Sequence, residues 1–404
     1  MSELTRANEP GVWSNWLGLR QRGVPLSGTG TIVTKQRLIE SAGLMAGLLA
    51  ECTGAEAAPG LLARLAAEAE RAGASDIHIQ MRGAAAEVRL RLDGVMTDAG
   101  VLPSGLAERV CGRVKFLARL KTYQESLPQD GRIDKADIGT AADVRVATYP
   151  TVTGEKIVLR LFQGDQERVV GDLGLPEGAR GAVSRFLKQS SGLLLLTGPA
   201  GSGKTTTIHA CLRELAAEKG RHIITVEDPV ERVLPGIMQT EVNEARGLDF
   251  ACAARHLLRQ DPQVLVIGEI RDESTAQIAL RAALTGHLII STLHAGSCRG
   301  VFERLSSFCP DASAIASATS LVLNQRLVRR LCPGCAGGGC PGCLGTGFAG
   351  RLVLAEFLAP GDEVRNLVLS REFRGIRAEP TLADCGRERV AAGLTTEAEV
   401  LRGL

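Results

Sequence analysis

A glycine-rich stretch that ends in a lysine and three threonines, GPAGSGKTTT, occupies residues 198–207. It fits the pattern G-x-x-x-x-G-K-[ST], in which backbone N–H groups close around a phosphate, the lysine reaches the β- and γ-phosphates, and the next hydroxyl is suited to Mg²⁺. Because the stretch follows the apolar run LLLLT and opens a helical segment, a chance glycine turn is disfavoured. The predicted nucleotide-binding residues are Gly198, Gly201, Ser202, Gly203, Lys204, Thr205 and Thr206, with Thr205 as a Mg²⁺ ligand.

Carboxylates follow two apolar runs downstream of this loop. The stretch ITVEDPVE carries Glu227, Asp228 and Glu231, and the stretch VLVIGEIRD carries Glu269. If these runs are parallel strands, their carboxyl ends meet at one edge of the sheet, beside the phosphate loop. Carboxylates at such an edge hold Mg²⁺ or orient the attacking water in nucleotide hydrolases, whereas isolated carboxylates usually cap helices or lie in solvated loops. The shared edge favours the nucleotide role.

Two histidines, His287 and His294, bracket the apolar run LIISTL. A lone histidine in such a place is more often a hydrogen-bonded structural residue than a ligand-binding one. Here the spacing is equally compatible with that structural role and with a functional one, contact to the γ-phosphate or to a subunit boundary, and both histidines are kept as candidates for nucleotide binding.

Four of the 11 cysteines form two Cys-Pro-Gly-Cys pairs, CPGCAGGGCPGC, at residues 332–343. Such pairs serve redox chemistry or bind a metal, or they belong to a glycine-rich loop without either role. A redox role would require a thioredoxin-like βαβ setting, which the surrounding sequence lacks. Four thiolates are suited to tetrahedral Zn²⁺, although the spacer between the pairs has only four residues. The predicted zinc ligands are Cys332, Cys335, Cys340 and Cys343.

The elements that must position these residues begin near residue 192. The runs GLLLLTG, RHIITVED, QVLVIGE and HLIISTLHA have the length and near-continuous apolar character of strands buried on both faces. They alternate with helical segments, an arrangement typical of an α/β fold with a parallel-rich central sheet. We expect this domain over residues 179–404, with the tetracysteine element inserted at 332–343.

The preceding part of the chain has a different pattern. Within residues 60–165, a helical stretch ends at Gly73 and is followed by runs such as AEVRLRLDG and GEKIVLRLF, which alternate apolar and polar residues. They predict a smaller α+β domain, followed by a polar, glycine-rich linker at 166–178. Residues 1–59 form a short N-terminal region that the sequence defines poorly.

Composition narrows the class of protein. The chain has 404 residues, 45% of them hydrophobic and 23% charged, as in ordinary globular proteins of two to three domains. Its net charge of +2 and its aromatic content of 3% argue against a nucleic-acid-binding surface. No apolar run reaches the ~18 residues that span a bilayer, and the N-terminus MSELTRANEPGVW lacks a signal-peptide pattern. These features predict a cytoplasmic protein without a transmembrane segment.

Taken together, the motifs resemble those of the secretion ATPases of type II secretion and type IV pilus systems, over about residues 60–357. GPAGSGKTTT resembles the family's Walker A motif, ITVEDPVE its aspartate box, VLVIGEIRD its Walker B motif and LTGHLIISTLHA its histidine box. Stretches such as ASDIHIQ, LPQDGRI and NQRLVRRLC also fit, in the family's order. The resemblance implies a RecA-like P-loop ATPase domain preceded by a PAS-like α+β domain.

The resemblance also implies roles for single residues. Glu269 is the first choice for the base that activates water and a candidate Mg²⁺ ligand, directly or through water, and Glu227 is the second choice for the base. Arginines of the N-terminal domain are expected to reach the nucleotide, and the candidates are Arg132, Arg145 and Arg160. Alternating arginines on a strand also fit a solvated face of the sheet, so the sequence does not select among them.

Finally, the resemblance implies a homo-hexamer that works with an inner-membrane platform protein and a cytoplasmic docking protein to assemble pilin or pseudopilin subunits. A tetracysteine element after QRLVRRLC is typical of assembly and secretion members, whereas retraction motors generally lack it. Members of this type usually carry a longer region before the α+β domain, so the identity of the system stays open. The alternative function is that of a DNA-handling RecA-like ATPase, which the near-neutral charge disfavours.

Overall fold

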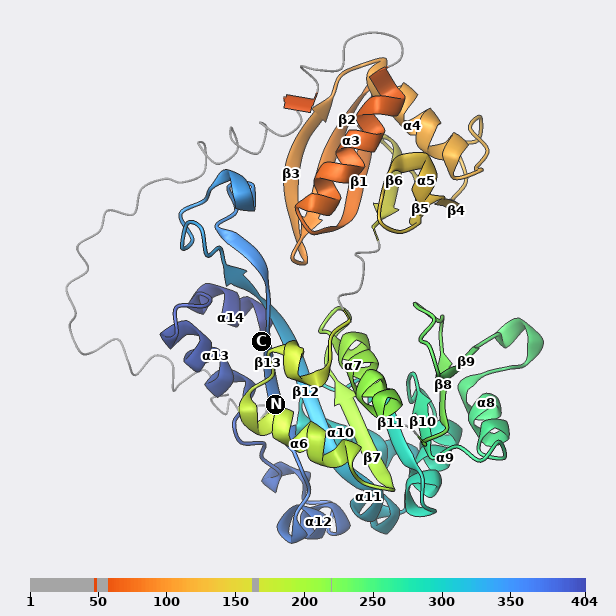
Figure 1. Cartoon of the computed structure of the whole chain (residues 1–404), viewed down its shortest axis with the longest axis vertical. Helices are drawn as coiled ribbons and strands as arrows, with labels where there is room; N and C mark the ends of the chain where they lie inside the picture. The colour runs from red at the N-terminus through yellow and green to blue at the C-terminus, as the bar shows by residue number, and fades with distance from the viewer. Residues whose placement is uncertain (1–46, 49–56, 162–166, 219) are drawn as a thin grey trace, which may run out of the picture.

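The computed structural model describes residues 47–48, 57–161, 167–218 and 220–404. The chain forms two sheets, one of six strands and one of seven, each with its own helices (Figure 1). Most of the N-terminal region expected at 1–59 lies outside the described residues. Among the described helices, none is both long and apolar enough to cross a membrane.

The N-terminal sheet has the strand order β3-β2-β1-β6-β5-β4, and every neighbouring pair is antiparallel. Alternate residues of β1, such as Ile77 and Ile79, point into a core that α3 and α4 cover with Leu61, Leu65 and Val110. This is the α+β unit predicted from the alternating runs. Its elements are α3 (Ala57–Arg71), β1 (Ala74–Arg82), β2 (Ala85–Leu92), β3 (Val95–Leu102), α4 (Leu106–Leu117), β4 (Gln129–Ile133), α5 (Lys135–Ile138), β5 (Val144–Thr151) and β6 (Gly154–Arg160).

The second sheet has the order β13-β12-β7-β11-β10-β8-β9, and all of its neighbouring strands are parallel except β12 and β13. The carboxyl ends of the parallel strands therefore meet at one edge. The strands are β7 (Gly192–Thr197), β8 (Ile223–Glu227), β9 (Met238–Glu241), β10 (Val264–Ile267), β11 (Leu288–Leu293), β12 (Thr319–Leu331) and β13 (Phe348–Leu358). The helices are α6 (Glu177–Leu187), α7 (Lys204–Ala217), α8 (Phe250–Leu257), α9 (Glu273–Leu284), α10 (Cys298–Phe308), α11 (Ala312–Ala318), α12 (Asp362–Leu369), α13 (Leu382–Ala391) and α14 (Glu397–Gly403).

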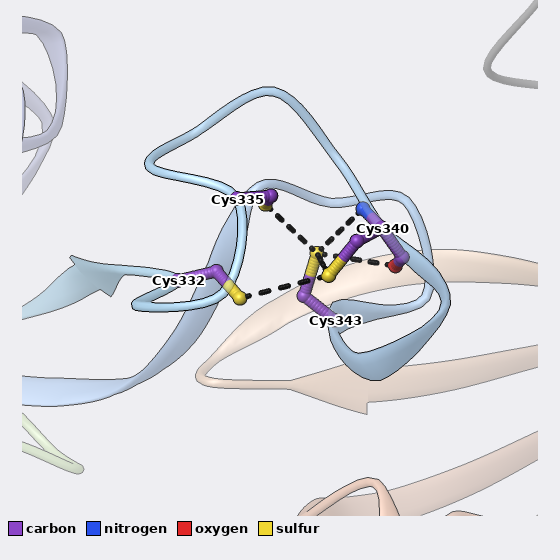
Figure 2. A group of neighbouring side chains, drawn as sticks. All are labelled: Cys332, Cys335, Cys340 and Cys343. Atoms are coloured by element: carbon purple, nitrogen blue, oxygen red, sulfur yellow. Dashed lines mark hydrogen bonds between the residues drawn. The ribbon is translucent and has the colours of Figure 1, made fainter.

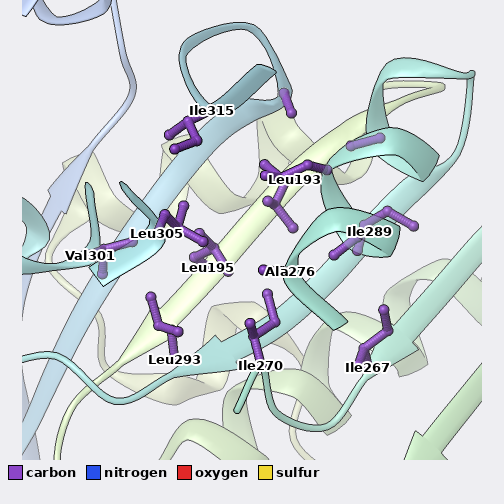
Figure 3. Packing of buried hydrophobic residues seen from close by; sticks show 14 of the residues in the cluster. Leu193, Leu195, Ile267, Ile270, Ala276, Ile289, Leu293, Val301, Leu305 and Ile315 are labelled. Atoms are coloured by element: carbon purple, nitrogen blue, oxygen red, sulfur yellow. The ribbon is translucent and has the colours of Figure 1, made fainter. Parts of the chain in front are cut away.

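Helices cover both faces of this sheet, so its central strands are buried along their whole length. In β7, Leu193 and Leu195 pack with α8, α9, α10 and α11, as Figure 3 shows from close by. Leu194 and Leu196 point the other way and pack with α6 and α7. This two-sided burial is why the runs read from the sequence are continuous rather than alternating. The α/β, parallel-rich fold expected from them is confirmed.

The later part of the stretch expected as a linker, residues 166–178, contains secondary structure. The described residues from 167 include a short 3₁₀ helix, η2 (Val170–Leu173), and α6 begins at Glu177. Val170 and Leu173 are buried in the same core as α6 and α7. The apolar residues within this polar, glycine-rich stretch are spaced to reach the core, so the ATPase unit begins earlier than the composition suggested.

Candidate functional site

The phosphate loop joins the carboxyl end of β7 to the start of α7. Lys204 Nζ bends back and donates to the carbonyl oxygens of Gly198 at 2.8 Å and Pro199 at 3.0 Å. Burial lowers the pKa of the Lys204 ammonium, and the nearby Glu269 carboxylate opposes that shift. Gly198 has a φ of 137°, and a Cβ there would lie 2.4 Å from the Gln325 carbonyl oxygen, so glycine is required at this turn.

Glu269 lies just past the carboxyl end of β10, two strands away from the loop in the sheet. His294, just past β11, places its Nε2 3.0 Å from Glu269 Oε1. Arg271 Nε donates to Glu269 Oε2 at 2.8 Å, and Arg271 Nη1 donates to Asp228 Oδ2 at 3.0 Å. Four side chains that follow three different strands thus form one connected network at the sheet edge.

Glu227 ends β8 and is held through one of its two oxygens. Its Oε1 accepts from Thr225 Oγ1 at 2.6 Å and from Gln239 Nε2 at 2.8 Å. Burial raises the pKa of Glu227, but the nearby His209 ring and the bonds from Thr225 and Gln239 outweigh it, so the pKa lies below its usual value. The carboxylate is therefore ionised at neutral pH.

These groups line a single cavity of about 450 Å³. The predicted residues in its lining are Gly201, Gly203, Lys204, Thr205, Thr206, Glu227, Asp228, Glu231, Glu269 and His294. Ser202 is buried within the loop. His287 precedes the other end of β11, the length of a six-residue strand away, where its Nδ1 lies 3.1 Å from the Ala282 carbonyl oxygen. The structure thus separates the two histidines, and only His294 reaches the cavity.

The three predicted arginines lie elsewhere, on the N-terminal sheet. Arg132 of β4 faces Arg145 of β5, and Arg145 faces Arg160 of β6, so the three form one row across the strands. Arg132 pairs with Asp143, and Arg160 Nε donates to Asp76 Oδ1 at 3.0 Å. All three arginines are exposed. The described part of one chain does not bring them into the lining of the nucleotide cavity.

Two further cavity residues were not found from the sequence. His209 follows Thr205 by four residues on α7, which places both on one face of the helix. This (i, i+4) spacing from Thr205 is the sequence signal by which His209 could have been found. Arg351 also lines the cavity, but it comes from β13, far along the chain, and no local pattern marks it.

The four cysteines converge at the end of the β12–β13 hairpin (Figure 2). Their sulfurs lie within 4.8 Å of one another. The Sγ–Sγ distances are 3.8 Å for Cys332 and Cys340, 3.8 Å for Cys335 and Cys343, and 3.7 Å for Cys340 and Cys343. Tetrahedral coordination with Zn–S bonds of about 2.3 Å requires sulfurs ~3.8 Å apart. The donor set and its spacing therefore fit Zn²⁺.

Backbone donors favour thiolates at this site. The amides of Cys340 and Gly347 donate to Cys343 Sγ at 3.2 and 3.3 Å, and Gly339 N donates to Cys335 Sγ at 3.2 Å. Burial raises the pKa of Cys343, but the amide bonds from Cys340 and Gly347 and the neighbouring thiols outweigh it, and the pKa falls to about 7. A backbone bond lowers the pKa of Cys340, but its bonds to the other sulfurs and burial outweigh it, and that pKa rises to about 11. A lowered thiol pKa favours metal binding, because the thiolate is the ligand.

The short spacer closes because its glycines adopt conformations that other residues avoid. In the spacer, Gly337 and Gly339 have φ values of 93° and 89°, and Gly347, beyond the second pair, has a φ of 77°. A Cβ at Gly347 would lie 2.5 Å from the Gly337 carbonyl oxygen, so the two arms of the loop touch through backbone alone. Four residues are therefore enough to bring the pairs together.

The tetracysteine element also contacts the N-terminal sheet. Leu344 packs against that domain's core. Gly350 N donates to Asp93 Oδ2 at 2.9 Å, and Arg351 Nε lies 4.0 Å from Asp93 Oδ1. The element therefore bridges the two sheets within one chain.

Comparison with known proteins identifies the family. The sequence profile of Type II/IV secretion system proteins matches residues 51–402. This chain belongs to that family. It is 40% identical over 354 residues to the type II secretion system protein HxcR of Pseudomonas aeruginosa, covering 84% of this chain and 75% of that one.

Two other similar proteins extend the comparison. The type IV pilus assembly ATPase PilB of Thermus thermophilus is 37% identical over 363 residues, which span 81% of this chain and 41% of PilB. A crystal structure of the pilus retraction motor PilT with ADP superposes with a TM-score of 0.60 at 25% identity, covering 84% of this chain and 96% of that one. The predicted membership of the secretion ATPases and the predicted ATPase activity are confirmed, and the DNA-handling alternative is not favoured.

Proposed function

We propose that this secretion-family ATPase hydrolyses ATP in the cavity at the carboxyl edge of the seven-stranded sheet and uses the energy to assemble pilin or pseudopilin subunits. The observation that carries the proposal is the position of Glu269. Its carboxylate is held by His294 at 3.0 Å and by Arg271 at 2.8 Å, in the same cavity as Lys204 of the phosphate loop. A fixed, charged carboxylate facing a phosphate loop is the arrangement that activates water for phosphoryl transfer.

Lys204 and Thr205 bind the triphosphate in this proposal. The Lys204 ammonium donates hydrogen bonds to two loop carbonyls. Phosphate oxygens would replace these carbonyls as acceptors, so the ammonium would keep hydrogen-bond partners throughout binding. Thr205 and Glu269 line the cavity and offer the oxygen ligands that Mg²⁺ prefers. Bound Mg²⁺ neutralises charge on the phosphates.

Glu269 is assigned as the base and Glu227 as an additional carboxylate that polarises water. The assignment follows from the partners of each side chain. Both Glu269 oxygens contact cationic or imidazole groups, which stabilise the carboxylate and fix its direction. Glu227 is fixed through Oε1 alone, and its Oε2 remains directed towards the cavity wall formed by His209.

We assign the row of Arg132, Arg145 and Arg160 to the nucleotide of a neighbouring copy in a hexamer. Like charges directly opposite each other on a sheet are destabilising, so three arginines in one row favour an anionic partner. Asp143 pairs with Arg132 and Asp76 pairs with Arg160, and both arginines remain exposed. A planar guanidinium suits the charge that develops on a transferring phosphoryl group.

Zn²⁺ on Cys332, Cys335, Cys340 and Cys343 acts as a structural brace in this proposal. Four protein ligands leave no open position for catalysis, as in other closed zinc sites. Because the same element contacts the N-terminal sheet, the metal supports the interface between the two units. By resemblance, this element assigns the motor to assembly rather than retraction.

The remaining partners complete the proposal. The motor acts in the cytoplasm and reaches the inner membrane through a platform protein and a docking protein. The names of the relatives, a type II secretion system protein and a type IV pilus assembly ATPase, support this setting.

The test is Glu269→Gln, which keeps the shape of the side chain and removes the base. We expect turnover to fall by about 10²–10⁴-fold, the range for a lost general base, while ATP binding is retained. Glu303→Gln is the matched control, because Glu303 is an exposed residue of α10 that pairs with Arg299 by an (i, i+4) contact. Unchanged phosphate release in Glu269→Gln would remove Glu269 from the role of base.

A further inference from the structure

His209 is a buried polar residue in the nucleotide cavity that the mechanism above does not use. Its side chain belongs to α7, is only 9% exposed and lines the cavity together with Glu227. Its Nε2 is buried and has no hydrogen-bond partner among the described residues. A buried nitrogen without a partner is costly, so its presence calls for a group that pairs with it in some state of the protein.

The nearest such group is Glu227. His209 Nε2 lies 3.9 Å from Glu227 Oε2, a distance slightly too long for a direct hydrogen bond. The other oxygen, Oε1, is already held by Thr225 and Gln239. The carboxylate is therefore anchored on one side, and its free oxygen faces the imidazole.

The same cavity contains a second carboxylate–imidazole pair, and its two side chains are in direct contact. Glu269 and His294 make the corresponding carboxylate–imidazole contact at 3.0 Å. The two pairs leave from different elements, since Glu227 and His209 come from β8 and α7 whereas Glu269 and His294 follow β10 and β11. The Glu269–His294 pair is at hydrogen-bond distance, whereas the distance in the Glu227–His209 pair is about one ångström longer.

We propose that His209 is a positioning residue for ATP hydrolysis, whose Nε2–H closes onto Glu227 Oε2, directly or through one water, when nucleotide fills the cavity. The contact would hold the second carboxylate in the direction needed to polarise water, as His294 holds Glu269. No bond is made or broken, and the only change is a hydrogen bond between two existing groups. The inference rests on the proposed ATPase function.

The experiment compares three variants at position 209 and its surroundings. His209→Phe keeps the ring volume and removes the donor, whereas His209→Gln keeps an amide donor near the position of Nε2. We expect His209→Phe to lower kcat roughly tenfold, about the effect of one lost hydrogen bond in the transition state. KM for ATP and the melting temperature should stay unchanged, and His209→Gln should recover most of the loss. His256→Phe is the matched control, because His256 is exposed on α8.

A double-mutant cycle with Glu227→Gln separates this role from packing. If His209 acts through Glu227, adding His209→Phe to Glu227→Gln costs little further turnover. Full activity in His209→Phe, equal losses in the Phe and Gln variants, or additive losses in the double variant would each overturn the inference. Wild-type protein and Glu269→Gln measured in parallel test the proposed function separately: no ATP turnover by the wild type would count against the proposed function, and unchanged turnover in Glu269→Gln would remove Glu269 from the role of base without bearing on His209.

Discussion

In the nucleotide cavity, the functional side chains leave from the ends of β7, β8, β10 and β11, strands whose residues are almost all buried. In the tetracysteine element, by contrast, Cys332 and Cys343 are the two buried residues among residues 332–343. The first site is held by a sheet with helices on both faces. The second has backbone turns but almost no apolar core.

The two sites differ in what stabilises their folded structure. A sheet that is already packed positions Lys204, Glu227 and Glu269 whether or not ATP is bound, because burial of the strands supplies the stabilisation. A loop without a core depends on its ligand, because the metal supplies the free energy that ordering the chain costs. We therefore expect the first site to lose function without losing structure, and the second to lose structure first.

The largest effect is expected for Lys204→Ala. Removing the ammonium removes the charge that faces the phosphates, and we expect ATP turnover to fall by at least about 10²–10³-fold, as for other lost electrostatic contacts in a transition state. The melting temperature and the zinc content should stay at wild-type values, since Lys204 Nζ donates its hydrogen bonds to two carbonyls of its own loop. Phosphate release, thermal unfolding and a colorimetric zinc assay measure the three quantities.

Lys188→Ala serves as the control, since Lys188 is an exposed residue at the end of α6. A marked fall in the melting temperature of Lys204→Ala would contradict the comparison, because the phosphate loop would then depend on its lysine for structure.

A smaller effect on turnover is expected when the zinc site is broken by Cys343→Ser or by a chelator. Cys343 accepts two backbone amide bonds and lies within 3.8 Å of two other sulfurs, so its loss removes the centre of the site. We expect zinc to fall from one per chain to nearly none, and the melting temperature to fall by about 2–4 °C, a loss of roughly 1 kcal/mol. Limited proteolysis should cut near residues 333–346, while ATP binding persists.

Cys252→Ser is the matched control, because Cys252 is a partly exposed free cysteine on α8. Protein purified without chelator that contains no zinc would contradict the brace. Equal protease resistance with and without metal would show that the backbone turns keep this element folded without zinc.

The residues of the nucleotide cavity could be placed from local sequence patterns, whereas the arginine row could not, for a physical reason. Strands that are buried on both faces form continuous apolar runs, and parallel strands place all their carboxyl ends at one edge. Glu227 and Glu269 could therefore be placed together without knowing the strand order. His294 follows from the same rule. His287 was predicted together with His294 for the nucleotide site, but it precedes β11 and so lies at the opposite end of that strand.

The arginine row and Arg351 could not be found in this way. Alternation along β4, β5 and β6 predicts which face each arginine occupies, but only the pairing register places Arg132, Arg145 and Arg160 opposite one another. Arg351 reaches the cavity through a hairpin that carries the tetracysteine element, so its position depends on long-range pairing. Such contacts are set by the whole fold rather than by local pattern.

The smallest effect on turnover is expected near the tetracysteine end of the same hairpin, where Glu399 of α14 pairs with Arg329 of β12 and with Arg402. Burial raises the pKa of Glu399, but the bonds from Arg329 and Arg402 outweigh it, and the pKa falls to about 2. A carboxylate with a depressed folded pKa stabilises the protein above its unfolded pKa, and this contribution is lost as the pH falls from about 4.5 towards 2.

We therefore expect Glu399→Gln to lower the free energy of unfolding by about 1 kcal/mol at pH 7, with unchanged turnover and zinc content. The difference from wild type should shrink when urea unfolding is repeated near pH 3, where the wild-type carboxylate begins to be protonated. Glu397→Gln, an exposed neighbour on the same helix, is the control. If Glu399→Gln released zinc, the contact between α14 and β12 would form one cooperative unit with the metal site, and the tetracysteine element would depend on packing as the nucleotide cavity does.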